Sequence, residues 1–266
     1  MKQAIRLVTS LILLASLVLG LSGLGFAQAV VRVGATPVPH AEILEHVVPI
    51  LEKQGIKLEI VEFNDYVLPN LAVHEGELEA NFFQHIPYLE NFNRDHRINL
   101  VSIAGVHVEP FGLYSNTLNN VEDLKLGATI AIPNDATNGG RALLLLQQAG
   151  LIKLDPKAGN APTVFDITEN KLNLRIVELE AAQLPRSLSD VTAACINGNY
   201  AIAAGLNPIK DALVIEGKDS PYVNVLAVDA KNANNANLLK LAEALNSEAI
   251  RQFILETYDG SVVPAF

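Results

Sequence analysis

The chain has 266 residues, and its 19 Lys and Arg against 29 Asp and Glu give a formal net charge of -10 at pH 7. An acidic chain without a cluster of basic residues is poorly suited to nucleic acid, whose phosphates require a positively charged surface. Its single cysteine, Cys195, excludes an intramolecular disulfide, so the fold depends on ordinary apolar cores. Cys195 lies in the apolar stretch VTAACI, where we expect a small buried hydrophobe rather than a nucleophile.

The first 29 residues have the composition of a cleavable signal peptide. Lys2 and Arg6 precede an apolar run from Leu7 to Leu21, and Ala27-Gln28-Ala29 fits the preference of signal peptidase for small residues. The run is shorter than the roughly 20 residues that span a bilayer, which disfavours a retained anchor. No cysteine follows it, so a lipid anchor is not expected either. We therefore predict an exported, periplasmic protein that begins at Val30 and has no direct membrane anchor.

The segment 30–110 alternates apolar, β-branched stretches with amphipathic ones. In the first amphipathic stretch, Ile43, Leu44, Val47 and Leu51 have helical spacing. This alternation is typical of βαβ units and predicts a first lobe with a parallel sheet. The predicted strands are 30–36, 56–63 and 78–83, with more within 98–115, and the predicted helices are 39–55, one within 64–77, and 87–96.

The segment 111–228 has the same α/β pattern and predicts a second lobe. Its strands are expected in 128–133, 163–167, 174–180, 191–196 and 223–230, with a Leu-rich helix up to Gly150. The last segment, 229–266, is predicted to be helical and to return to the first lobe. Two such lobes, joined by more than one crossover, form a cleft at the carboxyl ends of their strands, where α/β proteins bind ligands.

A turn rich in glycine and asparagine, 134–141, lies between a predicted strand and the Leu-rich helix. The start of a helix favours an anion, and Arg141 in the first turn adds a bidentate donor for a carboxylate. The alternative is that Thr137 or Asn138 only caps the helix and that Arg141 is a solvated charge. The residues alone leave both interpretations open. No Gly-Lys-Ser/Thr follows the glycines, so the turn is not a P-loop.

Aromatic residues gather at a second strand-to-helix junction, 82–88. Neighbouring residues of a strand point to opposite faces, so one of Phe82 and Phe83 is expected in the core. The other, with His85 and Tyr88, is suited to wall a pocket for an apolar side chain. Ordinary core packing is the alternative.

Other polar candidates are scattered along the chain. Amide side chains at turns suit both an ammonium and a carboxylate, although asparagine is also a common turn residue. No G-x-S-x-G, H-E-x-x-H or Cys/His cluster with metal spacing is present, so neither a catalytic nor a metal site is predicted. The polar candidates are Tyr66, His107, Glu109, the turn 197–200 and Asn224.

At these stretches the sequence resembles the NlpA/MetQ family, the methionine-binding receptors of bacterial ABC importers. The resemblance runs from about Val31 to the C-terminus through EANFFQHIPYLENFN, VHVEPFGLYS, IAIPNDATNGGRALLLLQQAGLI, LPRSLSDVTAACINGNYAIAAGL and SPYVNVLAV. It implies a two-lobed α/β fold of the periplasmic-binding-protein type, similar to type II, with the ligand between the lobes. It also implies partners, namely an ABC permease and its ATPase, and no cofactor. Family members are usually lipoproteins, so the missing cysteine is a departure.

The resemblance assigns roles to eight residues by their motifs. Arg141 is expected to bind the ligand carboxylate, and Asn138, Asn199 and Asn224 the polar backbone of the amino acid. The remaining four, Tyr66, Phe83, His85 and Tyr88, are expected to form the pocket for the thioether.

The predicted function is therefore reversible binding of methionine, without chemistry on it. L-methionine is favoured, and D-methionine or a derivative remains open. One alternative is a receptor for Zn or Mn that uses His40, His85, His107 and Glu109, since neutral imidazole and carboxylate suit these metals. Another is an enzyme on the same fold, because a fold does not determine function.

Overall fold

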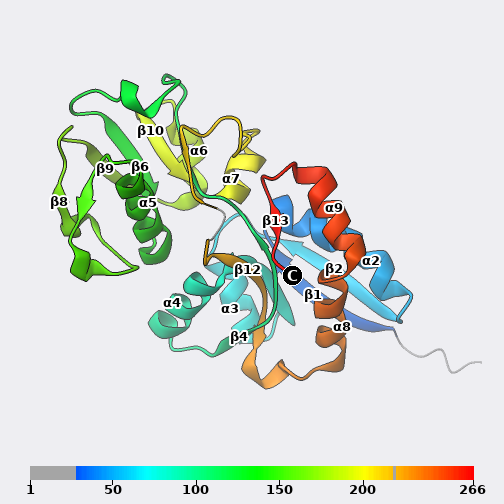
Figure 1. Ribbon diagram of the computed structural model, residues 1–266. Helices are drawn as coiled ribbons and strands as arrows, with labels where there is room; N and C mark the ends of the chain where they lie inside the picture. The colour runs from blue at the N-terminus through cyan, green and yellow to red at the C-terminus, as the bar shows by residue number, and fades with distance from the viewer. Residues whose placement is uncertain (1–27, 218–219) are drawn as a thin grey trace, which may run out of the picture.

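The computed structural model describes residues 28–217 and 220–266, which form two lobes joined side by side (Figure 1). The basic start and the apolar run of the predicted signal lie in residues 1–27, outside the described part. Within the described part, no helix has the length and apolar character needed to cross a membrane.

A six-stranded mixed sheet forms the centre of the first lobe, in the order β13-β4-β12-β3-β1-β2. As the βαβ pattern predicts, β1 pairs in parallel with β2 and with β3, whereas β12 runs antiparallel to β3 and β4. The strands are β1 (Ala29–Ala35), β2 (Ile56–Glu62), β3 (Ala80–His85), β4 (Leu100–Val108), β12 (Val223–Asp229) and β13 (Val263–Pro264).

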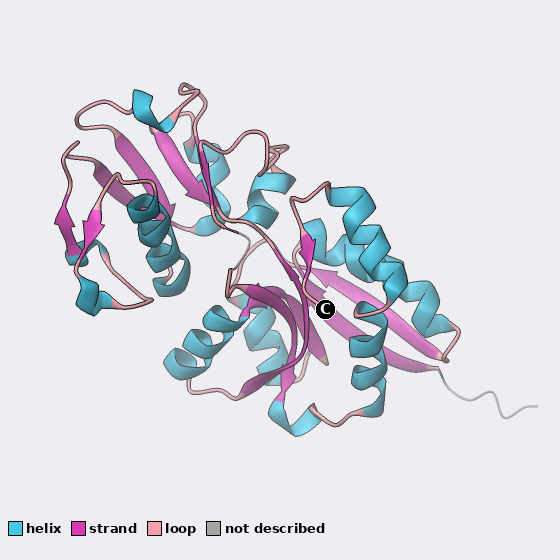
Figure 2. Cartoon of the chain, in the orientation of Figure 1, coloured by secondary structure: helices cyan, strands magenta, loops and turns pink. Residues whose placement is uncertain are grey.

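Helices cover both faces of this sheet (Figures 1 and 2). On one face α2, α8 and α9 pack in a single core with β1, in which Leu44, Leu241 and Ile254 are fully buried. On the other face α3 and α4 pack against β12. The helices are α2 (Glu42–Glu52), which continues a short turn η1 (Pro37–Ala41), α3 (Leu68–Glu75), α4 (Ile86–His96), α8 (Ala236–Leu245) and α9 (Glu248–Tyr258), with the short η6 (Ala230–Asn232).

The second lobe has a five-stranded sheet in the order β11-β5-β10-β6-β9 and a small hairpin of β7 and β8. Its main core joins α5 to β6 and β10, and Cys195 is fully buried there, as expected for a small hydrophobe. The strands are β5 (Gly112–Tyr114), β6 (Thr129–Pro133), β7 (Lys153–Leu154), β8 (Ile167–Glu169), β9 (Arg175–Leu179), β10 (Ala193–Ile196) and β11 (Val214–Ile215). The helices are α5 (Ala136–Gln148), α6 (Leu184–Ser187) and α7 (Gly198–Ala203), with short turns η2 (Val121–Asp123), η3 (Pro156–Ala158), η4 (Val164–Asp166) and η5 (Ala181–Gln183).

The boundary between the lobes differs from the predicted one. The predicted second lobe extends to residue 228, but β12 (Val223–Asp229) pairs with β3 and β4 of the first sheet. The physical reason is its burial on both faces: Leu226 and Val228 join one core of the first lobe, and Val225 and Ala227 join the other. The chain thus crosses between the lobes after β4 and again between β11 and β12.

The predicted strand 163–167 is also different in the structure. Residues Val164–Asp166 form the turn η4, and only Ile167 continues into the short strand β8. A capping box explains the turn, because Asp166 Oδ2 accepts hydrogen bonds from both the backbone N–H and the hydroxyl of Thr163 at 2.7 and 2.8 Å. The side chain of Asp166 therefore accepts the backbone N–H of Thr163 within the turn, and the strand begins only at Ile167.

Candidate functional site

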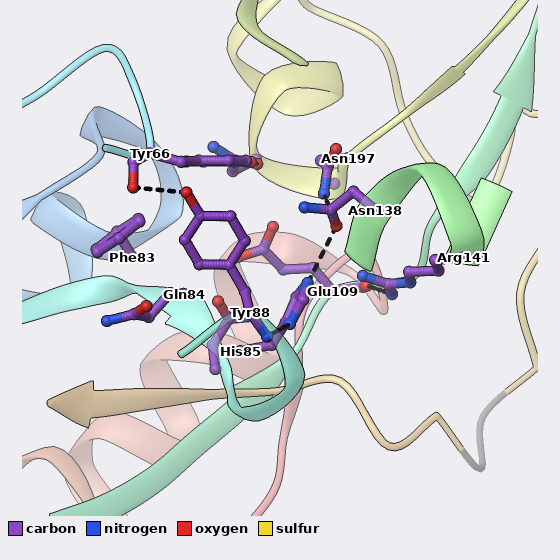
Figure 3. A pocket seen from close by; sticks show the side chains of 12 residues that line it. Tyr66, Phe83, Gln84, His85, Tyr88, Glu109, Asn138, Arg141 and Asn197 are labelled. Atoms are coloured by element: carbon purple, nitrogen blue, oxygen red, sulfur yellow. Dashed lines mark hydrogen bonds between the residues drawn. The ribbon is translucent and has the colours of Figure 1, made fainter. Parts of the chain in front are cut away.

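A cavity lies between the lobes (Figure 3). All eight residues that the resemblance singled out line it, together with Glu109 and the turn residues 197 and 198, which the sequence also marked as candidates. Gln84 is the lining residue that sequence reasoning missed. It lies between two predicted pocket residues, and its polar side chain gave no signal of its own. The lining residues are Tyr66, Phe83, Gln84, His85, Tyr88, Glu109, Asn138, Arg141, Asn197, Gly198, Asn199 and Asn224.

Strand ends bring these residues together from distant parts of the chain. The carboxyl ends of β3, β6 and β10 each lead into a helix at the cleft. The antiparallel strand β12 begins at the same edge, where Asn224 is paired with His85. This is the ligand position expected for open α/β sheets.

Three aromatic rings form one wall of the cavity. The ring centroid of Tyr66 lies 5.8 Å from those of Phe83 and Tyr88, and the hydroxyl of Tyr88 donates to the backbone oxygen of Tyr66 at 2.9 Å. Phe82 lies in the opposite direction, in the core of the first lobe. The strand alternation therefore separates a core phenylalanine from a cavity phenylalanine, as the sequence predicts.

His85 is held as a neutral imidazole. The backbone N–H of Tyr88 donates to its Nδ1 at 3.2 Å, so the proton is on Nε2, which donates to Asn138 Oδ1 at 3.0 Å. Burial, and next the positive charge of Arg141, lower the pKa of His85 to about 3. The ring therefore carries no charge, both of its nitrogens are bonded within the protein, and it offers an apolar face to the cavity.

Asp135 occupies the start of helix α5. Its carboxylate accepts from the backbone N–H of Asn138 at 2.9 Å and from the side-chain amide of the same residue at 3.0 Å. The alternative in which Thr137 or Asn138 caps the helix is therefore wrong: Asp135 is the N-cap residue. Because the protein's own carboxylate already neutralises this helix start, binding of another anion there depends on the side chain of Arg141.

Arg141 is buried, with only 4% of its surface exposed, so the interpretation as a solvated charge is excluded. Its guanidinium lies 4.0 Å from the ring centroid of Tyr222 and 5.0 Å from that of Phe111. Nε donates to Glu216 Oε1 at 3.0 Å, and Nη2 donates to Glu216 Oε2 and to the backbone oxygen of Glu109. Nη1 takes no part in these bonds. These bonds hold the guanidinium group in a fixed orientation, and Arg141 still lines the cavity.

A cluster of buried polar side chains surrounds Glu109 and Asn224, two of the residues that line the cavity. His40 Nε2 lies 3.1 Å from Asn224 Oδ1 and 3.3 Å from Glu109 Oε1, and His107 Nε2 lies 2.8 Å from the same carboxylate oxygen. Burial lowers the pKa of His40 to about 4 and that of His107 to about 3, and it raises the pKa of Glu109. Both imidazoles are therefore neutral: His107 Nε2 is hydrogen-bonded to Glu109 Oε1, and His40 Nε2 is hydrogen-bonded to Asn224 Oδ1.

Three of the four residues of the metal alternative meet at this point. Ligand atoms of His40, His107 and Glu109 all lie within 4.8 Å of one another. His85 does not join them, because its Nε2 is bonded to Asn138 across the cleft. The arrangement fits another role, in which His40 and His107 hold the carboxyl group of Glu109 in place at the cavity.

Hydrogen bonds between the lobes close the cleft over the cavity. Tyr66 donates to Asn199 Oδ1 at 2.6 Å, and the hydroxyl of Tyr200 donates to the backbone oxygen of Asn64 at 3.1 Å. The bond between His85 and Asn138 also crosses from one lobe to the other. The described conformation is therefore a closed one, in which both lobes contribute to the lining.

The chain is similar to known proteins over nearly all of its described length. The family model described as NlpA lipoprotein matches residues 31–266. The membrane lipoprotein TpN32 of Treponema pallidum is 45% identical over 236 residues, 88% of each chain. The D-methionine-binding lipoprotein MetQ of Salmonella typhimurium is 46% identical over 214 residues, 80% of this chain and 79% of the relative.

A solved structure is equally similar. A nutrient binding protein from Burkholderia cenocepacia bound to methionine matches with a TM-score of 0.87 and 45% identity, over 89% of this chain and 100% of that one. This similarity confirms the predicted α/β, two-lobed fold of a substrate-binding protein.

The same relatives contradict the prediction that a lipid anchor is unlikely. The family and both sequence relatives are named as lipoproteins. The prediction rests only on the lack of a cysteine after the apolar run, in a segment outside the described residues. Membership of a family of lipoproteins outweighs that single feature, so the prediction of an unanchored, freely diffusing protein is wrong.

Proposed function

This chain belongs to the NlpA lipoprotein family, and we propose that it is a receptor that encloses methionine between its lobes and delivers it to an ABC importer. One observation carries the proposal: a single buried cavity joins an aromatic wall to a fixed guanidinium and several amides. A relative named for D-methionine binding and a similar structure bound to methionine support the same ligand.

The cavity offers a complementary group for each part of an amino acid. Arg141 is the cation for the carboxylate, and its unused Nη1 is the donor available without breaking the pair with Glu216. Asn138, Asn199 and Asn224 supply oriented amide groups for the polar end. A charge-assisted hydrogen bond from arginine is stronger than a neutral one, so the carboxylate fixes the orientation of the ligand.

The thioether is proposed to lie among Tyr66, Phe83, His85 and Tyr88. Sulfur is polarizable and has favourable contacts with aromatic rings. A neutral His85 is required there, since an imidazolium would carry a charge into an apolar wall. The aromatic wall therefore supports selection of methionine over aliphatic side chains of similar size.

Delivery is proposed to follow closure. The bonds between Tyr66 and Asn199 and between Tyr200 and Asn64 hold the lobes together around the ligand, and a closed receptor presents a different surface to the permease than an open one. No catalytic step is proposed, because the cavity residues serve as hydrogen-bond partners for the intact ligand.

Ligand release from natively purified protein tests the proposal. Unfolding the protein should release methionine, identified by its mass, and the emptied protein should bind L-methionine more tightly than norleucine, which replaces the sulfur by a methylene. Titrations with D-methionine, leucine and Zn²⁺ set the specificity. Tight binding of Zn²⁺ with no binding of any amino acid would overturn the proposal in favour of the metal alternative.

A further inference from the structure

Asn138 Oδ1 accepts the hydrogen bond by which His85 joins the first lobe to the second (Figure 3). Resting on the proposed function, we infer that Asp135, which does not line the cavity, is a positioning residue for lobe closure: it turns the amide oxygen of Asn138 toward the first lobe and strengthens it as an acceptor. Its effect is on the equilibrium between the open and the closed receptor, whatever the side chain of the ligand.

The first lobe presents a hydrogen-bond donor to the cleft. His85 is the last residue of β3, and the backbone N–H of Tyr88, at the start of α4, donates to its Nδ1 at 3.2 Å. A neutral imidazole that accepts at Nδ1 carries its proton on Nε2. Only 5% of the surface of His85 is exposed, so this proton needs an acceptor within the protein. In the closed form the second lobe supplies that acceptor.

The second lobe presents an oxygen rather than an N–H group because of Asp135. An asparagine amide can face a partner with its oxygen or with its nitrogen. Both carboxylate oxygens of Asp135 lie 3.0 Å from Nδ2 of Asn138. A carboxylate accepts and cannot donate, so Nδ2 turns toward Asp135 and Oδ1 turns toward His85. With the opposite orientation of the amide, two donors would meet between the lobes.

The oxygen of Asn138 receives one donor from each lobe. Asn197 Nδ2 donates to it at 2.9 Å within the second lobe, and His85 Nε2 donates at 3.0 Å from the first. Asn138 is 1% exposed, so its oxygen depends on these two donors in the closed form. The negative charge of Asp135 polarises the amide and makes Oδ1 a stronger acceptor, because hydrogen bonds in a chain reinforce one another. Of the two bonds, the one from His85 is broken when the lobes separate.

Asp135 is also the N-cap of α5, and this role has to be separated from the first. Its Oδ1 accepts from the backbone N–H of Asn138 and from the hydroxyl of Thr137, each at 2.9 Å. Serine is an equally good N-cap residue, but it has neither the charge nor the second oxygen. Asparagine keeps the shape and one acceptor oxygen without the charge. Asp135→Asn and Asp135→Ser therefore reduce the proposed effect in two steps while the helix stays capped.

The distance between the lobes tests the inference directly. Cys195, the single cysteine of the chain, is fully buried, so spin labels can be attached at the exposed positions Gln54→Cys in the first lobe and Ser189→Cys in the second. Double electron–electron resonance then gives the populations of open and closed receptor with and without L-methionine. At each methionine concentration, Asp135→Ser should lower the ratio of closed to open receptor by about 5- to 20-fold, and Asp135→Asn should have a smaller effect.

Affinities should change in parallel, since binding is coupled to closure. Asp135→Ser should weaken L-methionine and norleucine by the same factor, up to about 20-fold, through a faster dissociation. The ratio of the two affinities should stay at its wild-type value. In a His85→Phe background the further effect of Asp135→Ser on methionine should fall below about 2-fold, because the bond between the lobes is already absent.

Asp155→Ser is the matched control. Asp155 caps the short turn η3 of the second lobe, where its carboxylate accepts from the backbone N–H of Lys157 at 2.9 Å, and it does not line the cavity. This variant has the same change of residue and of net charge as Asp135→Ser. It should leave the distances between the lobes unchanged and both affinities within about 2-fold of the wild type.

The outcomes are distinct. Wild-type distances and affinities in Asp135→Ser would overturn the inference, and so would a loss of stability in denaturant titrations without a change in closure. A changed ratio of methionine to norleucine would also overturn it, because Asp135 would then act on the ligand side chain. If Asp135→Ser does not fold, Asp135→Asn gives the same comparison. A wild type that binds no amino acid would contradict the proposed function, whereas the distances measured without ligand would still test the role of Asp135.

Discussion

Arg141 and Glu216 lie 75 positions apart in the sequence and form a bidentate ion pair beside the cavity, with Arg141 Nε 3.0 Å from Glu216 Oε1. Glu216 lies outside the cavity lining, in an outer groove that it shares with Tyr222. The pair fixes the plane of the guanidinium from behind, and the ring of Tyr222 supports its face at 4.0 Å. The site proposed for the ligand carboxylate therefore depends on Glu216 and Tyr222, which lie between β11 and β12, where the chain crosses back to the first lobe.

Arg141→Ala should weaken methionine binding by at least about 30-fold, since truncation of a buried charged partner costs about 2–5 kcal/mol. Isothermal titration calorimetry measures the loss, and circular dichroism checks that the fold is retained. Arg32→Ala is the matched control, because Arg32 pairs with Glu79 on the surface of the first lobe. Unchanged affinity in Arg141→Ala would contradict the carboxylate role.

Glu216→Gln should leave the buried guanidinium without a counter-charge. We expect a loss of about 2 kcal/mol in the free energy of unfolding without ligand. Saturating methionine should then raise the unfolding midpoint more than it does in the wild type, because the ligand carboxylate supplies the missing charge. Differential scanning fluorimetry with and without methionine measures both effects.

The control for this variant is Glu169→Gln, which removes an exposed partner of Lys153 and should change stability by less than about 1 kcal/mol. A smaller ligand-induced shift in Glu216→Gln than in the wild type would show that Arg141 does not receive the ligand carboxylate.

Phe83→Leu should reduce the preference for methionine over norleucine by about 2- to 10-fold, the range of a contact between sulfur and an aromatic ring. Competition titrations give the ratio of affinities directly. Phe92→Leu is the matched control, since Phe92 packs in the same aromatic cluster but does not line the cavity. If both variants change the ratio equally, the aromatic wall does not recognise the thioether.

Stability should fall as the pH is lowered from 7 to 5. The folded-state pKa values of His40, His85 and His107 are about 4, 3 and 3, below the ordinary value of 6.5, because the rings are buried. Between these values the unfolded chain binds protons that the folded chain does not. Stability present above pH 6.5 is therefore lost on acidification, by about 2 kcal/mol per histidine between pH 7 and pH 5.

The raised pKa of Glu109 acts in the opposite direction and offsets part of this loss. Denaturant titrations at several pH values measure the slope. His107→Gln should lower the slope by about one proton. A free energy of unfolding independent of pH between 7 and 5 would contradict the buried neutral histidines.

The sequence by itself determined much of the local structure. Helical and alternating spacings placed most elements, and the alternation at Phe82 and Phe83 separated core from cavity because side-chain direction follows from neighbouring positions alone. The motifs also indicated the family and eight cavity residues. These features depend on residues close together in the chain, or on ordered motifs that can be read directly.

Only the tertiary structure decided the contacts between distant segments. The place of strand 223–229 in the first sheet could not be read from the sequence, because its partners, β3 and β4, lie more than a hundred positions earlier in the chain. The pair of Arg141 with Glu216 and the approach of His40 to Glu109 likewise join residues that lie far apart in the chain. Asn197 Oδ1 is buried without a hydrogen-bond partner because Asp135 orients the amide of Asn138, which in turn orients the amide of Asn197. These hydrogen bonds exist only after the second lobe has folded. Such partners are set by packing and by the need to satisfy buried polar groups, which spacing along the chain does not encode.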